Sequence, residues 1–434
     1  MSQNLPVLDP LATFVDVGSE RMHVSIGGNP PKVFGTFTAD LNKLRKWLID
    51  EGVHSVAMEA TGVYWLPLYK VLEEAGLEVR MINGRQTRNL PGRKTDMADS
   101  QWGATLHMHG LLQPGFVPPA DVRKLQDYVR LRAEHVAAAG SCVQLMQKAF
   151  ERMNIKLHDV IASLAGVSGM AIARAIVAGE RSPFTLLQMC DVQIRSRKEK
   201  NVLESLEGTW DEEHIFALKQ AIESWDHYQK LIADCDRQIG AILPPLDEDE
   251  PPLPKNHKHG GTNAPQIKHL RQILAQMCGT DLTQLPGLTQ YNVLQLISET
   301  GSDLSAWPTE KHFVSWAGLA PRSKDSGKRK GNRKTQCNRT GRILCMAAQS
   351  LARSKDMALG GFYRRLRGRR GGLVAIKAVA RKLGVWIWRL IVKGEQYVER
   401  GLAHYGEQVQ KSKEAALRRL AKELGREIVP ATPA

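Results

Sequence analysis

The stretch Arg93-Lys94-Thr95-Asp96-Met97-Ala98-Asp99-Ser100 organises the N-terminal part of this chain. Its two carboxylates are three residues apart and no Gly or Pro follows before Gly103, so the spacing predicts a helix with both acids on one face. Two acidic oxygens on one face come within range of a hard cation such as Mg²⁺. A lone D-x-x-D pair is more often a solvated helix face, so the interpretation depends on what precedes it.

Two upstream acids each lie at the end of a short apolar run. The runs are Phe14-Val15-Asp16-Val17-Gly18 and Val56-Ala57-Met58-Glu59-Ala60-Thr61-Gly62, both typical of a buried strand closed by a Gly turn. An acid inside a sheet is costly unless it lies at a strand end beside a cation or a hydrogen-bond donor. The two strand-end acids and the helical pair therefore predict a site of four carboxylates: Asp16, Glu59, Asp96 and Asp99.

The first hundred residues predict a mixed sheet with covering helices. Three strands come first and helices then alternate with strands, which is the order of an RNase H-like fold. The expected strands are Thr13–Val17, Met22–Ile26, Lys32–Phe37, Ser55–Glu59 and Glu78–Ile82, and the expected helices are Leu41–Glu51 and Tyr64–Ala75.

Composition limits the classes of function. With 434 residues the chain is long enough for two or three domains, and its net charge of +15 favours a polyanionic partner, nucleic acid before membrane. The six cysteines are scattered without a C-x-x-C pair, which argues against a zinc finger or a disulfide framework. Without an 18-residue apolar run or a signal segment, the sequence predicts a cytoplasmic protein.

Two long amphipathic segments, 120–153 and Glu212–Ile242, predict long helices. They are compatible with an antiparallel coiled-coil hairpin or dimerisation arm, and equally with an ordinary helical bundle. An acidic, proline-rich stretch near residue 244 is typical of a linker. The expected domains are a RuvC-like acidic domain (1–118), a coiled-coil or helical region (119–243), a linker (244–262), a mainly helical domain (263–400) and a basic helical tail (401–434).

The C-terminal half contains a Gly turn and a basic segment. Leu285-Pro286-Gly287-Leu288 before a helix over Gln290–Thr300 is compatible with a helix-hairpin-helix phosphate contact or with a simple turn. Between Arg322 and Arg342 there are nine Lys or Arg residues and one acid, and the Gly, Ser and Asn among them predict a loop that contacts phosphodiesters. The expected nucleic-acid-binding residues are Arg93, Lys94, Arg322, Lys324, Lys328, Arg329, Lys330, Arg333, Lys334, Arg339 and Arg342.

The residue types allow metal-assisted phosphoryl transfer. Four carboxylates can hold two Mg²⁺ ions about 4 Å apart, with Mn²⁺ as a substitute, and stabilise both the attacking and the leaving oxygen. No His or Cys cluster is evident in the sequence, so a softer metal is not expected. Ser326, beside a Gly in the basic segment, is either a nucleophile in a positive field or a turn and phosphate contact, and spacing alone favours the second role. Ser323 is the alternative nucleophile.

The ordered motifs resemble the DEDD transposases of the insertion-sequence family one hundred and ten, in its eleven-eleven branch, which are related to Piv-type DNA invertases. The matching elements are Val15-Asp16-Val17-Gly18, Met58-Glu59-Ala60-Thr61-Gly62, Lys94-Thr95-Asp96-x-x-Asp99, Leu285-Pro286-Gly287-Leu288, Ala317-Gly318-Leu319-Ala320-Pro321-Arg322 and Ser326-Gly327. The resemblance extends from about residue 12 to residue 395. Many relatives have Ser-Ser-Gly where this chain has Asp325-Ser326-Gly327.

The resemblance implies a RuvC-like, RNase H-fold domain joined by a coiled-coil region to a helical transposase domain. It implies that the four acids hold the metal and that Ser326 attacks DNA to form a phosphoserine link. It also implies donor and target double-stranded DNA as substrates, a structured noncoding bridge RNA as guide, and dimers that assemble into tetramers. In such an assembly the acids and the serine can come from different subunits.

Two other functions are compatible with the same residues. One is a metal-dependent nuclease or Holliday-junction resolvase in which water attacks and Ser326 has no covalent role. The other is a nucleic-acid-binding assembly protein whose acids are structural.

Overall fold

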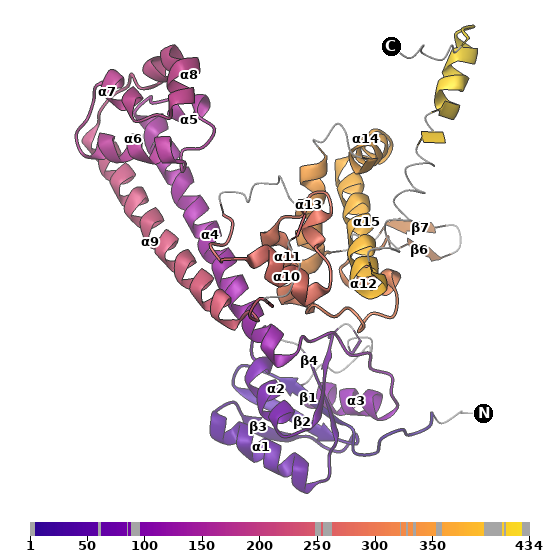
Figure 1. Cartoon of the computed structure of the whole chain (residues 1–434). Coiled ribbons are helices and arrows are strands. Elements are labelled where there is room, and N and C mark those ends of the chain that lie inside the picture. Colours follow the sequence, from indigo (N-terminus) through magenta and orange to yellow (C-terminus); the bar gives the residue numbers. More distant parts are fainter. Residues whose placement is uncertain are drawn as a thin grey trace. The chain divides into compact units, whose positions relative to one another are not determined.

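The computed structural model divides the chain into two compact units, Met1–Val117 and Pro118–Ala434 (Figure 1). It describes residues 5–59, 62–84, 86–87, 96–247, 253–254, 263–321, 323–326, 329–332, 336–352, 358–394, 410–411 and 414–427. For residues 323–326 and 329–332 the description is limited to the backbone.

The first unit is built on a five-stranded sheet in the order β3-β2-β1-β4-β5. Strand β1 pairs antiparallel with β2 and parallel with β4, β2 pairs antiparallel with β3, and β4 pairs parallel with β5. This order and these directions are those of an RNase H-like sheet. The five predicted strands are confirmed: β1 (Thr13–Val17), β2 (Arg21–Ile26), β3 (Lys32–Gly35), β4 (Ser55–Glu59) and β5 (Glu78–Ile82).

Side chains alternate between the two faces of this sheet, as the pleat of a strand requires. Val15 and Val17 of β1 belong to one buried cluster with α1 (Thr38–Asp50) and α2 (Trp65–Glu74). Phe14 belongs to a separate cluster on the other face, beneath α3 (Asp96–Met108). Burying one aliphatic side chain completely stabilises the folded state by about 1.5–3 kcal/mol relative to leaving it exposed. The apolar residues of each strand therefore determine which face of the sheet the residues between them occupy.

Helix α3 lies close to the sheet because its contact residues are small. Gly103 and Ala104 are buried, and a Cβ added at Gly103 would overlap the ring of Phe14. Further along α3, the ring nitrogens of His107 lie 2.9 Å from the Thr13 carbonyl oxygen and 3.1 Å from the Ser55 hydroxyl oxygen. Burial lowers the pKa of His107, and its two contacts join α3 to β1 and β4.

The second unit begins with two long helices, α4 (Ala120–Arg152) and α9 (Glu212–Ile242). They run antiparallel: Phe150 at the end of α4 shares a core with Leu218 near the start of α9. Both predicted helices are confirmed, while the dimerisation arm stays a prediction. The chain between them forms four shorter helices packed into the same core: α5 (Leu157–Val160), α6 (Val167–Val177), α7 (Pro183–Gln188) and α8 (Val192–Ser205).

The remaining part of the second unit is mainly helical, with one small hairpin. The indole nitrogen of Trp388 in the last of these helices donates to the Trp307 carbonyl oxygen at 3.0 Å, and the Trp388 side chain is buried in the core. The elements are α10 (Leu270–Cys278), η1 (Leu282–Gln284), α11 (Gln290–Thr300), α12 (Glu310–Trp316), β6 (Ser323–Ser326), β7 (Arg329–Asn332), α13 (Arg339–Leu351), α14 (Ala358–Arg370) and α15 (Gly372–Lys393).

None of the helices in the described ranges combines the length and the apolar character needed to cross a bilayer.

A buried ion pair links α4 to α9. The guanidinium of Arg132 donates to Asp236 at 2.6 Å and to the Asn263 carbonyl oxygen at 3.1 Å, and the Arg132 and Asp236 side chains are only 1% and 3% exposed. Asp236→Ala leaves a buried cation without its partner and should lower the free energy of unfolding by about 3–5 kcal/mol.

The exposed pair between Arg237 and Asp234 on the same helix provides the control. Asp234→Ala should change stability by less than about 1 kcal/mol, because exposed pairs are screened by water. Denaturant unfolding of the three proteins measures the difference, and equal losses from both substitutions would show that the buried pair has no special role.

Candidate functional site

Strand register brings Asp16 and His23 to the same face of the sheet. The two residues are directly paired across β1 and β2, and their neighbours Val17 and Met22 point into the cluster on the opposite face. Glu59 at the end of β4 follows the same alternation, because Met58 belongs to that opposite cluster. Asp16, His23 and Glu59 therefore project from the sheet towards the side covered by α3.

Helix α3 supplies the other two predicted acids from its first turn. Asp96 and Asp99 are separated by one helical turn, and both are exposed. Ligand atoms of Asp16, His23 and Asp96 all lie within 4.8 Å of one another. The structure thus brings Asp16 and Asp96 together, from segments eighty residues apart, as the sequence predicted.

The carboxyl group of Asp16 is the electrostatic centre of the cluster. Its pKa is raised from 3.8 to about 6, first by burial and then by the negative charges of Asp96, Glu59 and Asp99, while His23 opposes the shift. All three other acids are therefore near enough to repel a charge on Asp16. Such mutual repulsion disfavours the ionised cluster unless a cation neutralises it.

Glu59 is held by the segment that follows β5. The hydroxyl of Thr87 donates to a Glu59 carboxylate oxygen at 3.3 Å. Gly84 lies against the same carboxylate, so closely that an added Cβ would overlap it. The absence of a side chain at this position lets the backbone approach the carboxylate, and together the two residues limit how Glu59 can turn.

The donors fit a divalent cation. Carboxylate oxygens are the ligands that Mg²⁺ and Mn²⁺ prefer, and Asp16 carries the charge repulsion that such an ion would relieve. Asp16 and Asp96 would bind the ion directly, and Glu59 and Asp99 are placed to share the charge.

His23 is a member of the cluster that sequence reasoning missed. The predicted site contains four acids and no histidine, whereas β2 places His23 opposite Asp16. A signal was present in the sequence: Met22, Val24 and Ile26 alternate towards the core, which directs His23 to the other face. Only the pairing register, however, shows that this face carries Asp16.

The basic segment forms a β-hairpin, so the prediction of a loop without regular structure is wrong there. Strands β6 and β7 pair antiparallel, with Ser326 opposite Arg329 and Asp325 opposite Lys330. Ser326 is therefore the last residue of β6, and Ser323 is its first.

The predicted nucleic-acid-binding residues fall into three groups. Arg339 and Arg342 lie on α13, where Arg342 is exposed and Arg339 is 3.9 Å from Glu299. The backbones of Lys324, Arg329 and Lys330 lie in the hairpin strands. The others are outside the described residues: Arg93, Lys94, Arg322, Lys328, Arg333 and Lys334.

Gly287, the glycine of the candidate phosphate-binding turn, has a packing role. Its φ of +81° is in the left-handed region, and an added Cβ would lie 2.7 Å from the Ala347 carbonyl oxygen in α13. This environment favours the interpretation as a tight turn between packed helices.

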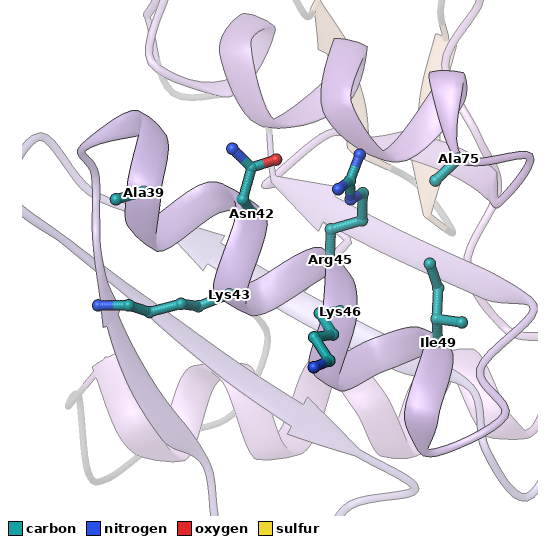
Figure 2. A pocket seen from close by; sticks show the side chains of 7 residues that line it. All are labelled: Ala39, Asn42, Lys43, Arg45, Lys46, Ile49 and Ala75. Carbon is teal, nitrogen blue, oxygen red and sulfur yellow. The ribbon is translucent and has the colours of Figure 1, made fainter.

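A shallow recess on the first unit lies apart from the acids. It has a volume of about 550 Å³, and Figure 2 shows that its lining comes mainly from α1, with Ala75 from the end of α2. Lys43, Arg45 and Lys46 line it. Since α1 and α2 cover the face of the sheet opposite α3, this basic recess is not part of the acidic cluster.

The approach of α3 to the sheet predicts a test of the site geometry. Gly103→Ala inserts a methyl group against the Phe14 ring, which should cost about 1–3 kcal/mol in stability and displace Asp96 from Asp16. We expect a weaker affinity for Mg²⁺ in a calorimetric titration.

The control is Gly140→Ala in α4, where nothing lies within 4 Å of the added atom. There alanine should be neutral or stabilise the helix by up to about 1 kcal/mol. Unchanged Mg²⁺ affinity in Gly103→Ala would show that α3 does not set the position of the acids.

Two family models match the chain. Residues 15–155 match a model described as "Transposase", DEDD_Tnp_IS110, and residues 279–364 match one described as "Transposase IS116/IS110/IS902 family". The first region contains the four acids and the second contains Ser326. The DEDD match implies an RNase H-like fold, in agreement with the strand order, and suggests dependence on a divalent metal. No curated protein matches the chain.

Proposed function

With both regions of the IS110-family transposases on one chain, the protein is an enzyme that acts on DNA in transposition or recombination, and we propose that it cuts and rejoins strands through a covalent serine intermediate. The observation that carries the proposal is the environment of Asp16, where three further acids repel its charge in a partly buried site. A divalent cation would relieve this repulsion, and phosphoryl transfer is assisted by such an ion.

Asp16, Glu59, Asp96 and Asp99 would hold two divalent ions, Mg²⁺ or Mn²⁺. Bound there, the ions would neutralise charge on the phosphate oxygens and favour an ionised attacking hydroxyl. The chain itself contributes the position of the carboxylates: β1 and β4 fix two of them, and α3 brings the other pair onto the same face. Thr87 holds Glu59 in orientation through its hydroxyl.

Ser326 supplies the nucleophile in this proposal. Its Oγ forms a bond to a DNA phosphorus atom, and the bond from that phosphorus to a sugar oxygen breaks. The serine loses its proton and the leaving sugar oxygen gains one, so the phosphodiester is exchanged for a phosphoserine ester and a free hydroxyl. Attack by the hydroxyl of another strand reverses these steps and rejoins the DNA.

The basic residues around Ser326 would bind the substrate. Lys324, Arg329 and Lys330 belong to the same hairpin, and each phosphate that a cation neutralises releases counterions. We propose that a structured noncoding RNA selects donor and target DNA by base pairing, with the protein contacting mainly the backbone. The active assembly is a dimer joined through α4 and α9, and dimers assemble into a tetramer.

The test is to trap the covalent intermediate. The full chain is incubated with Mg²⁺, labelled DNA from the region flanking its gene, and RNA transcribed from that region. We expect a labelled protein–DNA adduct that survives denaturation and depends on Mg²⁺. Strand cleavage without any adduct would favour the metal-dependent nuclease, and the absence of both cleavage and adduct under all conditions would favour a binding protein.

A further inference from the structure

His23 is not one of the four acids, yet it lies among them. It comes from β2, directly opposite Asp16, and its ring is partly buried. One of its ring nitrogens lies within 4.8 Å of carboxylate oxygens of both Asp16 and Asp96. Among the described residues, these three side chains are the group on the α3 side of the sheet whose ligand atoms converge in this way.

The spacing of the three groups suits an ion between them. Ligands of one octahedral ion at about 2.1 Å are about 3 Å apart when adjacent and about 4.2 Å apart when opposite, so groups within 4.8 Å of one another would have to close by at most about 2 Å around the ion. No ion pair or hydrogen bond between described side chains joins the His23 ring to either carboxylate. The imidazole is therefore placed beside the acids without a direct bond to them.

We propose that His23 is a direct nitrogen ligand of the ion held by Asp16 and Asp96, and that this centre therefore binds a transition-metal dication such as Mn²⁺ in preference to Mg²⁺. The inference rests on the proposed metal-dependent function and adds the identity of the ligand set. Imidazole suits transition metals, whereas Mg²⁺ is held almost entirely by oxygen. A site with one nitrogen ligand and several carboxylates should therefore favour Mn²⁺ over Mg²⁺ more strongly than a site with carboxylates alone.

The surroundings of His23 support a ligand role over a purely structural one. His107, a histidine of α3, is buried and has both ring nitrogens occupied by Thr13 and Ser55. His23 lies instead beside Asp96, an exposed residue in the first turn of α3. The pairing of β1 with β2 fixes its backbone, so a ring in this position is available to an ion at little conformational cost.

The first test is spectroscopic and uses the full chain with one equivalent of Mn²⁺. Electron spin-echo modulation detects a nitrogen nucleus bound directly to Mn²⁺, and we expect an imidazole nitrogen signal in the wild-type protein. The signal should disappear in His23→Ala and persist in His54→Ala, which removes an exposed histidine just before β4. Mn²⁺ bound without any nitrogen signal in the wild type would overturn the proposal.

The second test is calorimetric. Loss of a residue that only hydrogen-bonds to a metal ligand typically weakens metal binding about tenfold or more. Removing His23, as a direct ligand, should therefore weaken Mn²⁺ binding by at least about tenfold. The same substitution should change Mg²⁺ binding by less than about threefold, because Mg²⁺ is held mainly by oxygen. His23→Gln, which keeps a polar side chain, guards against a folding defect in the alanine variant. Equal losses for both ions, or none, would contradict a nitrogen ligand.

The outcomes separate this inference from the proposed function. If divalent ions bind and support adduct formation while His23→Ala changes neither the spectrum nor the ion preference, the inference fails and the function stands. If neither ion binds to the wild-type cluster, both fail.

Discussion

Replacing Ser326 by alanine is expected to abolish the covalent protein–DNA adduct, because the bond to phosphorus forms through the missing Oγ atom, and any residual strand cleavage by water would leave no adduct. Alanine at the end of β6 removes the Oγ atom and keeps the backbone that pairs with Arg329. The proposed metal site belongs to the first unit, so Mg²⁺ binding should be unchanged. Denaturing gel analysis of labelled DNA after incubation measures the adduct.

Ser323→Ala is the matched control for this substitution. Ser323 lies in the same strand, at the other end of β6, and its replacement should leave the adduct within about twofold of wild type. An adduct that persists undiminished in Ser326→Ala and disappears in Ser323→Ala would assign the nucleophile to the alternative serine. Strand cleavage that persists in both variants without an adduct would instead assign the reaction to a water nucleophile.

Asp16→Asn is expected to have two opposite effects, one on catalysis and one on stability. Loss of the central carboxylate should lower strand cleavage by about 10³-fold or more, since the metal contributes several kcal/mol to transition-state stabilisation and each 1.36 kcal/mol is a factor of ten. In metal-free buffer at pH 7.5 the same substitution should make the protein more stable, because it removes the charge that Asp96, Glu59 and Asp99 repel.

The sign of the stability effect follows from the pKa of Asp16, which is about 6 in the folded chain against a usual value of 3.8. The folded chain binds this proton more tightly, so stability falls as the pH rises from about 4 to about 6, and the cost is fully present above pH 6. The shift corresponds to about 3 kcal/mol. Because the carboxyl group is partly exposed, we expect about 1–2 kcal/mol.

Denaturant unfolding in EDTA at pH 4 and at pH 7.5 measures this effect. Asn resembles the protonated carboxyl group, so wild type and variant should be equally stable at pH 4 and differ at pH 7.5. Addition of Mg²⁺ should stabilise the wild type and not the variant. A variant that is less stable than wild type at pH 7.5 without metal would show that the acids are not a repulsive cluster.

The sheet and its acids could be predicted because their signals are local. The apolar runs around Asp16 and Glu59, each closed by a Gly turn, define the strand ends without knowledge of their neighbours. The helical spacing of Asp96 and Asp99 likewise depends only on adjacent residues. Once these segments are assigned as strands and helices, their order along the chain predicts the RNase H-like sheet. Three strands followed by alternating helices and strands have few compact arrangements.

The position of His23 beside the acids and the hairpin could not be predicted in the same way. His23 joins the site through a pairing between two strands, and a shift of one residue would have turned it towards the opposite face. In the basic segment, the many Gly, Ser and Asn residues favoured a loop. The structure has two paired strands there, because pairing of β6 with β7 satisfies the hydrogen bonds of the backbone N–H and C=O groups. Amino-acid composition gives no information on that pairing. Gly103 also matters only through its contact with Phe14, which no pattern along the chain reveals.

The most direct test of the central claim is the position of the bound ion. Crystals of the full chain with DNA and Mn²⁺, measured at a wavelength where manganese scatters anomalously, would locate each ion independently of its ligands. We predict an anomalous peak within about 2.3 Å of an Asp16 oxygen, with Asp96 as a second ligand. Manganese bound elsewhere in the chain, with no peak at Asp16, would contradict the account.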